Sequence, residues 1–226
     1  KIFKVKVFLT LLALYDFKNK SRTFKAVCLF VFKNCDVIFV EGENGKKDIE
    51  IFNQQKKVKV FNHWVDQDIF KPDRLAKNTS QDKIRVLFVG RPIPEKGKHI
   101  IEEAEKKINQ PDKYHFTYVQ DIPHDLLPSY YQMADVVVVP SLYPEGFCRV
   151  VAESASCGCA VITSDKGSLP DMVKEFGWII EDIDSMALAS VLECIDAKIF
   201  GKQSYKYAKQ NFSSKNSEVF LNEYSK

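Results

Sequence analysis

The 226-residue sequence lacks the cysteine patterns of metal centres and of disulfide frameworks. Its six cysteines include no CxxC pair and stand near no cluster of histidines. This argues against a zinc site and favours a reducing compartment. Long apolar runs are also missing: VFLTLLALY, near the start, is too short to span a bilayer and has no small-residue cleavage site. We therefore expect a cytoplasmic protein.

A strong net charge is missing as well. The formal net charge of +3 is too small to indicate nucleic acid as a partner. Residues 1–35, however, carry eight Lys or Arg and a single acid, Asp16. This basic, apolar segment either packs on a neighbouring sheet, which we favour, or lies peripherally on an anionic membrane surface. Self-association through an exposed apolar face is a further alternative.

Apolar spacing predicts a small α/β part at the start of the chain. Helices are expected over 3–15, where KVKV could equally be a strand edge, and over 21–34. DVIFV (36–40) and KVKVF (57–61) are typical of strands, and GENG reads as a turn before a helix over 47–55. A long polar connection then runs to Gln81. We assign residues 1–75 to a reduced N-terminal, acceptor-side part.

The rest of the chain, residues 76–226, predicts a doubly wound parallel sheet with a C-terminal helix. Its apolar runs show no polar alternation and are separated by helical patterns, which is typical of parallel strands covered on both faces. The expected strands are 84–90, 113–119, 135–141, 160–164 and 177–181. The fold class is therefore α/β, with a Rossmann-like C-terminal domain.

The stretch PEGFCRVVAE follows the apolar run VVVVPS and places Glu145 and Glu153 eight residues apart. Ligands of open parallel sheets bind beyond the carboxyl ends of the strands. A helix expected to begin near Gly146 would offer free N–H groups to a phosphate there. Eight residues of helix would then place Glu153 roughly 12 Å from Glu145 along the helix axis. Two carboxylates flanking such a helix start suit a sugar–diphosphate–nucleoside.

Cations for the diphosphate stand in the loop after the first strand of this half, GRPIPEKG. Arg91 and Lys96 follow Gly90 and should reach the same edge of the sheet. Each of these residues alone is more often a solvated surface charge. Their combination at the carboxyl ends of parallel strands favours a binding site, with the loop at Asp121 as the candidate for contacts to the base.

These motifs resemble a known family. IRVLFVGRPIPEKG and ADVVVVPSLYPEGFCRVVAESASCGCAVITSDKGSLPDMV are similar to the donor-binding half of GT-B-fold, family-four retaining glycosyltransferases, the glycosyl transferases group 1. Glu145 and Glu153 match the E-x7-E element of the family, and Arg91 and Lys96 match its paired basic residues. NHWVDQDIF resembles the N-G-V-D linker element. The resemblance runs from about residue 36 to residue 198.

The resemblance implies a glycosyltransferase that moves a hexose from a nucleotide-diphosphate sugar, such as UDP- or GDP-hexose, with retention at the anomeric carbon. No cofactor and no metal are expected, and the acceptor, a glycan, lipid or protein, stays unidentified. The catalytic residues implied are Glu145, Arg91 and Lys96. The donor-binding residues expected, from motif and resemblance together, are Glu153, Gly146, Phe147, Cys148, Arg149, Val150, Gly90 and Asp121.

Other interpretations stay open. Only about eighty residues precede the donor half, so a non-catalytic nucleotide-sugar-binding module that needs a partner chain for the acceptor site is the alternative. A different GT-B enzyme, such as an epimerase or phosphorylase, is a third. Asp66-Gln67-Asp68 forms a D-x-D, but in an irregular linker rather than at a strand end. His115 and His124 are read as a strand position and a helix start, not as a catalytic pair.

Overall fold

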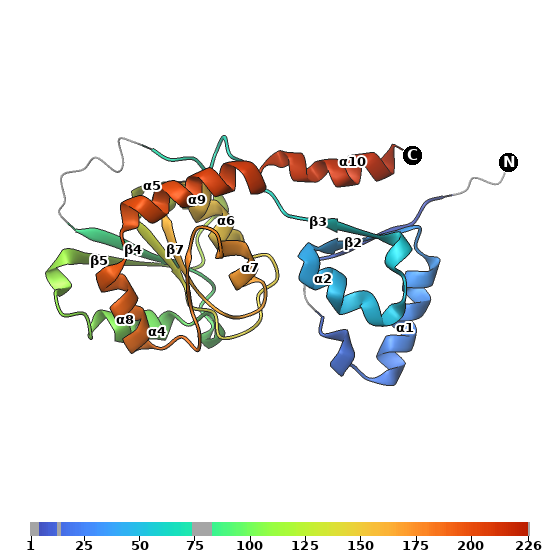
Figure 1. The fold of residues 1–226 in the computed structure, drawn as a ribbon, viewed down its shortest axis with the longest axis horizontal. Coiled ribbons are helices and arrows are strands. Elements are labelled where there is room, and N and C mark those ends of the chain that lie inside the picture. Colours follow the sequence, from blue (N-terminus) through green and yellow to red (C-terminus); the bar gives the residue numbers. More distant parts are fainter. Residues whose placement is uncertain (1–4, 13–14, 74–82, 226) are drawn as a thin grey trace. The chain divides into compact units, whose positions relative to one another are not determined.

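The computed structural model describes residues 5–12, 15–73 and 83–225. The chain divides into two compact units, which Figure 1 shows as ribbons: Lys1–His63 with Lys215–Lys226, and Trp64–Ser214. The division falls earlier than the expected boundary at 75/76, and it assigns the end of the chain to the first unit. No helix in the described part of the chain is both long and apolar enough to cross a membrane.

The first unit is built on three parallel strands in the order β1-β2-β3. The strands are β1 (Phe8–Leu11), β2 (Val37–Glu41) and β3 (Val58–Phe61). The helices are α1 (Arg22–Asn34), α2 (Gly42–Ile49) and α10 (Glu218–Tyr224), with 3-10 turns η1 (Phe17–Asn19), η2 (Glu50–Phe52) and η3 (Gln55–Lys57). A further 3-10 turn, η7 (Ser214–Ser217), begins at the last residue of the second unit and continues into the first. Ser21 caps α1 by accepting a hydrogen bond from the backbone of Phe24.

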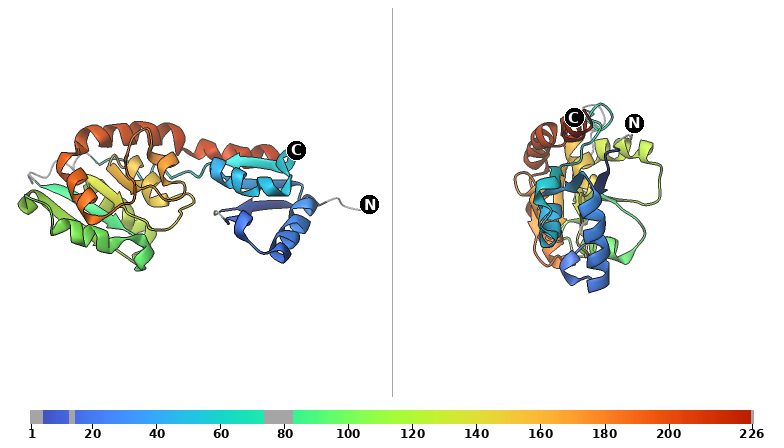
Figure 2. Two further views of the ribbon diagram at one scale, coloured as in Figure 1. Left: turned by 60° about the horizontal axis from the view of Figure 1, so that its bottom comes forward. Right: turned by 90° about the vertical axis from the view of Figure 1, so that its right-hand side faces the viewer.

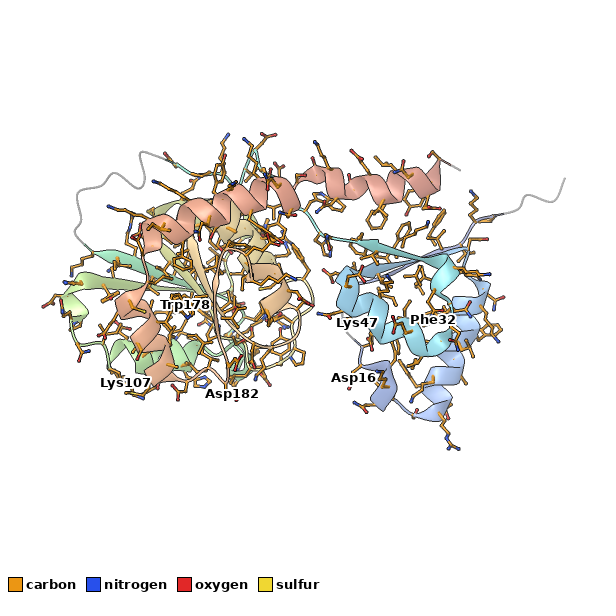
Figure 3. All side chains as sticks on the ribbon, viewed as in Figure 1. Asp16, Phe32, Lys47, Lys107, Trp178 and Asp182 are labelled. Atoms are coloured by element: carbon orange, nitrogen blue, oxygen red, sulfur yellow. The ribbon has the colours of Figure 1, made fainter. Side chains whose placement is uncertain are left out.

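Aromatic side chains fill both faces of this sheet. On one face the ring of Phe32, labelled in Figure 3, lies 4.8 Å from that of Phe52. On the other face Phe39 and Phe61 pack against Phe220 of α10, at ring distances of 4.4 and 4.9 Å. This second contact explains why the last residues belong to the first unit rather than, as expected, to the C-terminal domain.

Two local predictions for the first unit are wrong. Residues 3–15 were expected to be helical, but Phe8–Leu11 pairs in parallel with Val37–Val40 of β2, and sheet pairing overrides the helical spacing. The remainder of that segment is irregular where it is described. GENG is not a turn but the first residues of α2, because Gly42 adopts a left-handed φ of +61° that redirects the chain from strand to helix.

The second unit confirms the expected doubly wound parallel sheet. Its strands run in the order β5-β4-β6-β7-β8, and all pair in parallel. They are β4 (Ile84–Val89), β5 (Tyr114–Val119), β6 (Val136–Val139), β7 (Ala160–Ser164) and β8 (Trp178–Ile180). The helices are α4 (Lys98–Glu105), α5 (Leu127–Met133), α6 (Arg149–Ser156), α7 (Leu169–Val173), α8 (Ser185–Cys194) and α9 (Ala197–Asn211).

Helices cover both faces of this sheet, as the views in Figures 1 and 2 agree. Side chains of α5, α6, α7 and α9 form one buried cluster with the sheet, and those of α4 and α8 form the other. All four residues of β6 are buried, which accounts for the unbroken run of valines in the sequence. Because β4 and β6 are neighbouring parallel strands, their carboxyl ends lie at the same edge of the sheet.

The expected irregular connection is confirmed over 62–73, which contains no helix or strand; residues 74–81 of that prediction lie outside the described residues. Two hydrogen bonds attach its second-unit part to α9. The backbone N–H of Val65 donates to the carbonyl of Phe212 at 3.0 Å, and the side chain of Gln67 donates to the carbonyl of Ala208 at 2.8 Å. The connection is thus fixed to the end of α9 after the division between the units.

Candidate functional site

Glu145, in the loop after β6, is held by the loop that follows the neighbouring strand β7. Its backbone forms a parallel bridge with Gly167, and its carbonyl accepts a hydrogen bond from the N–H of Ser168 at 2.9 Å. Gly167 has a φ of +64°, and a Cβ there would lie 2.3 Å from the Glu145 carbonyl oxygen. Only glycine allows this approach. The backbone of Glu145 is therefore fixed beyond the carboxyl ends of β6 and β7.

Lys96 reaches the same place from the loop after β4, within the 3-10 turn η4 (Pro94–Lys96). Gly97 follows it with a φ of +73°, and a Cβ there would come within 2.1 Å of the Pro140 carbonyl oxygen. The carbonyl of Glu95 also accepts a hydrogen bond from the N–H of Leu142 at 2.8 Å. The loops after β4 and β6 are thus in direct backbone contact, which brings their polar side chains together.

The two loops meet in an ion pair. Nζ of Lys96 lies 2.6 Å from Oε1 of Glu145, and both side chains are largely buried. Ser141 donates to the same oxygen at 2.5 Å, and the hydroxyl of Tyr143 donates to Oε2 at 3.2 Å. Lys96 also stands 5.0 Å above the Tyr143 ring, in cation–π contact.

This environment keeps Lys96 charged. Burial lowers the pKa of the Lys96 ammonium, but hydrogen bonds to Glu145 and Tyr143 and the nearby carboxylate outweigh it, so the pKa is raised overall. The Lys96 ammonium can donate hydrogen bonds to an anionic ligand group and offset its charge, while the almost buried Glu145 carboxylate beside it can accept hydrogen bonds from ligand hydroxyls.

The helix that follows Glu145 begins later than the sequence predicted. α6 starts at Arg149, not near Gly146, because the bridge to Gly167 holds the chain extended at Glu145. The estimate of roughly 12 Å along one helix axis between Glu145 and Glu153 therefore does not apply, since Glu145 lies outside the helix. Of the amides expected at the phosphate, that of Cys148 already donates to the sulfur of Met172 at 3.3 Å.

Glu153 lies on α6 at the centre of a second polar cluster. Its side chain is 3% exposed. Its Oε1 is 2.8 Å from Nε2 of His124 and 3.1 Å from a terminal nitrogen of Arg149, and its Oε2 accepts from the Tyr131 hydroxyl at 3.2 Å. Burial raises the pKa of Tyr131 well above its usual value, so this hydroxyl keeps its proton and remains a donor.

The remaining predicted site residues lie around these two clusters or apart from them. Arg91 is exposed, and within the described residues its side chain makes no hydrogen bond or ion pair. Asp121 is also exposed, in a left-handed conformation with φ of +51°. Phe147 and Val150 are partly buried against the core. Gly90 follows β4, and its N–H donates to the Val119 carbonyl at 3.1 Å.

Sequence reasoning missed four side chains of the site. They are Ser141 and Tyr143 beside Glu145, and His124 and Tyr131 beside Glu153. The first two stand two to four residues from Glu145, so their proximity could have been used. The second pair lies 29 and 22 residues from Glu153, and only the fold brings it there. His124 does begin a helical turn, η6 (His124–Leu126), as expected, and His115 is an exposed residue of β5.

The D-x-D of the linker forms a turn in which Asp66 accepts a hydrogen bond from the N–H of Asp68 at 3.0 Å. Within residues 5–12, 15–73 and 83–225, no three His, Cys, Asp or Glu side chains are grouped so that they could hold a metal ion.

Curated relatives cover only part of the chain. It is 26% identical over 203 residues to the putative glycosyltransferase YtcC of Bacillus subtilis (strain 168), which covers 70% of the chain and 50% of that protein. It is 30% identical over 134 residues to spore coat protein SA of the same organism, covering 44% of the chain and 36% of that protein. The alignments thus span between about a third and a half of these relatives.

Solved structures share the fold at low identity. Sucrose-phosphate synthase of Thermosynechococcus elongatus has a TM-score of 0.74 at 22% identity, covering 99% of this chain and 68% of that one. Anabaena Alr3699/HepE in complex with UDP-glucose has a TM-score of 0.78 at 17% identity, covering 98% and 72%. They confirm the GT-B fold. The family model described as "Glycosyl transferases group 1" matches residues 73–210, more than half of the sequence. The chain belongs to the glycosyl transferases group 1 family.

Proposed function

We propose that this chain binds a nucleotide-diphosphate hexose and takes part in transferring the hexose to an acceptor with retention of configuration. The observation that carries the proposal is the Lys96–Glu145 pair, which joins the loops after β4 and β6 at the carboxyl edge of the sheet. Membership of a glycosyltransferase family supports the same conclusion.

In the proposed reaction, the bond between the anomeric carbon and the diphosphate oxygen breaks and its electrons leave with the diphosphate. Lys96 and Arg91 neutralise that charge, which lowers the barrier without a metal or cofactor. The Glu145 carboxylate, with Ser141 and Tyr143 donating to it, accepts hydrogen bonds from hexose hydroxyls. The acceptor oxygen then bonds to the anomeric carbon on the face that the diphosphate left, and the proton of the acceptor hydroxyl passes to the departing diphosphate oxygen.

The nucleoside end of the donor is assigned to α6. Glu153 accepts hydrogen bonds from the ribose hydroxyls. The first amides of the helix, at Arg149 and Val150, face the diphosphate, where the positive end of the helix dipole favours an anion. Asp121 is proposed near the base. The Anabaena neighbour was solved with UDP-glucose, which supports a uridine donor as the first to test.

A non-catalytic donor-binding module remains the second candidate. The alignments reach about half of the curated relatives or less, and the sheet of the first unit has three described strands. A partner chain would then supply the acceptor site.

Contacts of the first unit with other surfaces are also proposals. α1 packs Phe32, Cys28 and Leu29 on its own sheet, as the packing interpretation expected. Its other face leaves Val27 58% and Phe30 69% exposed, among Lys and Arg side chains. This face suits peripheral contact with an anionic membrane or with a second copy of the chain, in a cytoplasmic protein.

Titration calorimetry with UDP-, GDP- and ADP-hexoses tests the proposal. The chain should bind at least one of them, and Lys96→Ala and Glu153→Ala should each weaken binding about tenfold or more, because each removes a hydrogen bond to a charged group. Lys98→Ala is the matched control: Lys98 pairs with Glu102 and should bind as the wild type does. Binding that is unchanged in both site variants would refute the donor site. Donor hydrolysis or transfer by the chain would then separate the enzyme from the module.

A further inference from the structure

A single ring nitrogen of His124 makes two short contacts. Its Nε2 lies 2.8 Å from Oε1 of Glu153 and 2.6 Å from a terminal nitrogen of Arg149. The ring also packs on the buried Phe70 at a centroid distance of 5.3 Å. These contacts come from three separate segments: the linker, the turn η6 and the helix α6.

The two contacts cannot both be hydrogen bonds. An imidazole nitrogen either carries a proton and donates, or lacks one and accepts. With a proton, Nε2 donates to Glu153 and has no lone pair for Arg149. Without one, it accepts from Arg149, and its lone pair then faces the Glu153 carboxylate. His124 therefore either donates to Glu153 or accepts from Arg149, whereas Arg149 contacts Glu153 through Nε at 3.2 Å and through a terminal nitrogen at 3.1 Å in either case.

Exposure indicates which group can leave. The side chain of Arg149 is 66% exposed and that of His124 is 49% exposed, whereas that of Glu153 is 3% exposed and is also held by the Tyr131 hydroxyl. The His124 ring is half-exposed, but it packs on Phe70 of the linker, a contact that does not depend on Arg149. Arg149 can therefore turn toward solvent or a phosphate, while His124 and Glu153 stay in place.

We propose that His124 is a positioning residue that donates from Nε2 to Glu153 and so fixes this carboxylate for the ribose diol of a nucleoside diphosphate, while Arg149 turns away when the ligand binds. This inference rests on the proposed donor site and adds to it the group that orients its ribose-binding carboxylate. A carboxylate oriented by Tyr131 and His124 keeps its free lone pairs toward the ligand, so it should distinguish ribose from deoxyribose.

The test measures ribose preference by calorimetry. The wild type is titrated with UDP, GDP and ADP, and the tightest of these is compared with its 2′-deoxy and 3′-deoxy forms. A preference for the ribose form of about tenfold or more is expected, since hydroxyls bonded to a charged carboxylate are lost in the deoxy forms.

Two substitutions then separate positioning from packing. His124→Phe keeps a ring on Phe70 but removes the donor, and the ribose preference should fall below about threefold while affinity for the deoxy form hardly changes. His124→Gln restores an N–H near Nε2, and the preference should return. His115→Phe replaces an exposed histidine of the same unit and should change nothing. If His124→Phe does not fold, His124→Ala takes its place with the same expected loss.

The positioning role would be overturned if His124→Phe kept the full preference for ribose, or if His124→Gln lost that preference as well. Either result would leave the donor site intact. A wild type that binds none of the three nucleoside diphosphates would overturn the donor site and this inference together. A wild type that binds them without preferring ribose would overturn the inference alone.

Discussion

Replacing Gly167 by alanine should displace Glu145 and cost both stability and donor binding. The added Cβ would lie 2.3 Å from the carbonyl oxygen and 2.4 Å from the nitrogen of Glu145, and 2.9 Å from the carbonyl carbon of Pro144. All three are backbone atoms, so no side chain can rotate out of the way. The loop that carries Glu145 has to move instead.

The size of the effect has two parts. A left-handed φ costs a non-glycine residue about 1–2 kcal/mol. Forcing extra volume into a packed contact costs about 1–3 kcal/mol more. The Gly167→Ala protein should therefore lose about 2–5 kcal/mol of unfolding free energy. A shift of Glu145 by about 1 Å should also lower any transfer rate on the order of a hundredfold, because reacting groups tolerate little misplacement.

Gly42→Ala provides the control. Gly42 has a similar φ of +61°, yet a Cβ there would have nothing within 4 Å. It should therefore show the backbone strain alone, about 1–2 kcal/mol. Urea unfolding followed by circular dichroism gives both values, and titration with the nucleotide sugar gives the affinities. If Gly167→Ala lost no more stability than Gly42→Ala and bound donor normally, the contact between Gly167 and Glu145 would not hold the site.

Three further predictions concern the ion pair, the thiols and α10. Lys96→Met should lower the unfolding free energy by about 3 kcal/mol in urea, because it leaves Glu145 almost buried without its cation, and adding Glu145→Gln should recover part of that loss. Folding raises the pKa of Lys96 above its usual 10.5, so the pair stabilises fully below about pH 10.5 and loses its contribution as the pH rises further. The unfolding free energy of Lys96→Met should therefore fall less at alkaline pH than that of the wild type. An equal fall in both proteins would contradict this. Burial raises the pKa of Cys148 to about 12. Iodoacetamide at pH 8 should therefore label the exposed Cys194 and leave Cys148 unmodified in the native protein, which peptide mass mapping would show. Equal labelling of the two thiols would refute the burial of Cys148. Phe220→Ala should destabilise the first unit by about 3 kcal/mol, because it uncovers Phe39 and Phe61. Hydrogen exchange should rise in β2 and β3 but not in β6, and a uniform rise would argue against a separate first unit.

The sheet of the second unit could be predicted because its strands are buried on both faces. A run such as VVVV in β6 has one physical interpretation once helical patterns flank it. The meeting of Lys96 and Glu145 followed from the rule that ligands bind at the carboxyl edge, although their contact depends on β4 and β6 being neighbours in the sheet.

Features set by distant contacts could not be predicted in the same way. α6 begins at Arg149 because Glu145 pairs with Gly167, a residue of the next loop. β1 is a strand because it pairs with β2, although its apolar spacing is helical. His124 reaches Glu153 only after η6 and α6 are placed side by side by the fold.

The loops after β4 and β6, with the start of α6, form the site proposed to bind a nucleotide-diphosphate sugar. Hydrogen–deuterium exchange of the chain with and without UDP-, GDP- and ADP-hexoses tests it most directly. Binding should slow exchange in the segment around Lys96 and in the segment from Glu145 to Glu153, and leave α1 unchanged. Slower exchange elsewhere with no change in these two segments would contradict the account.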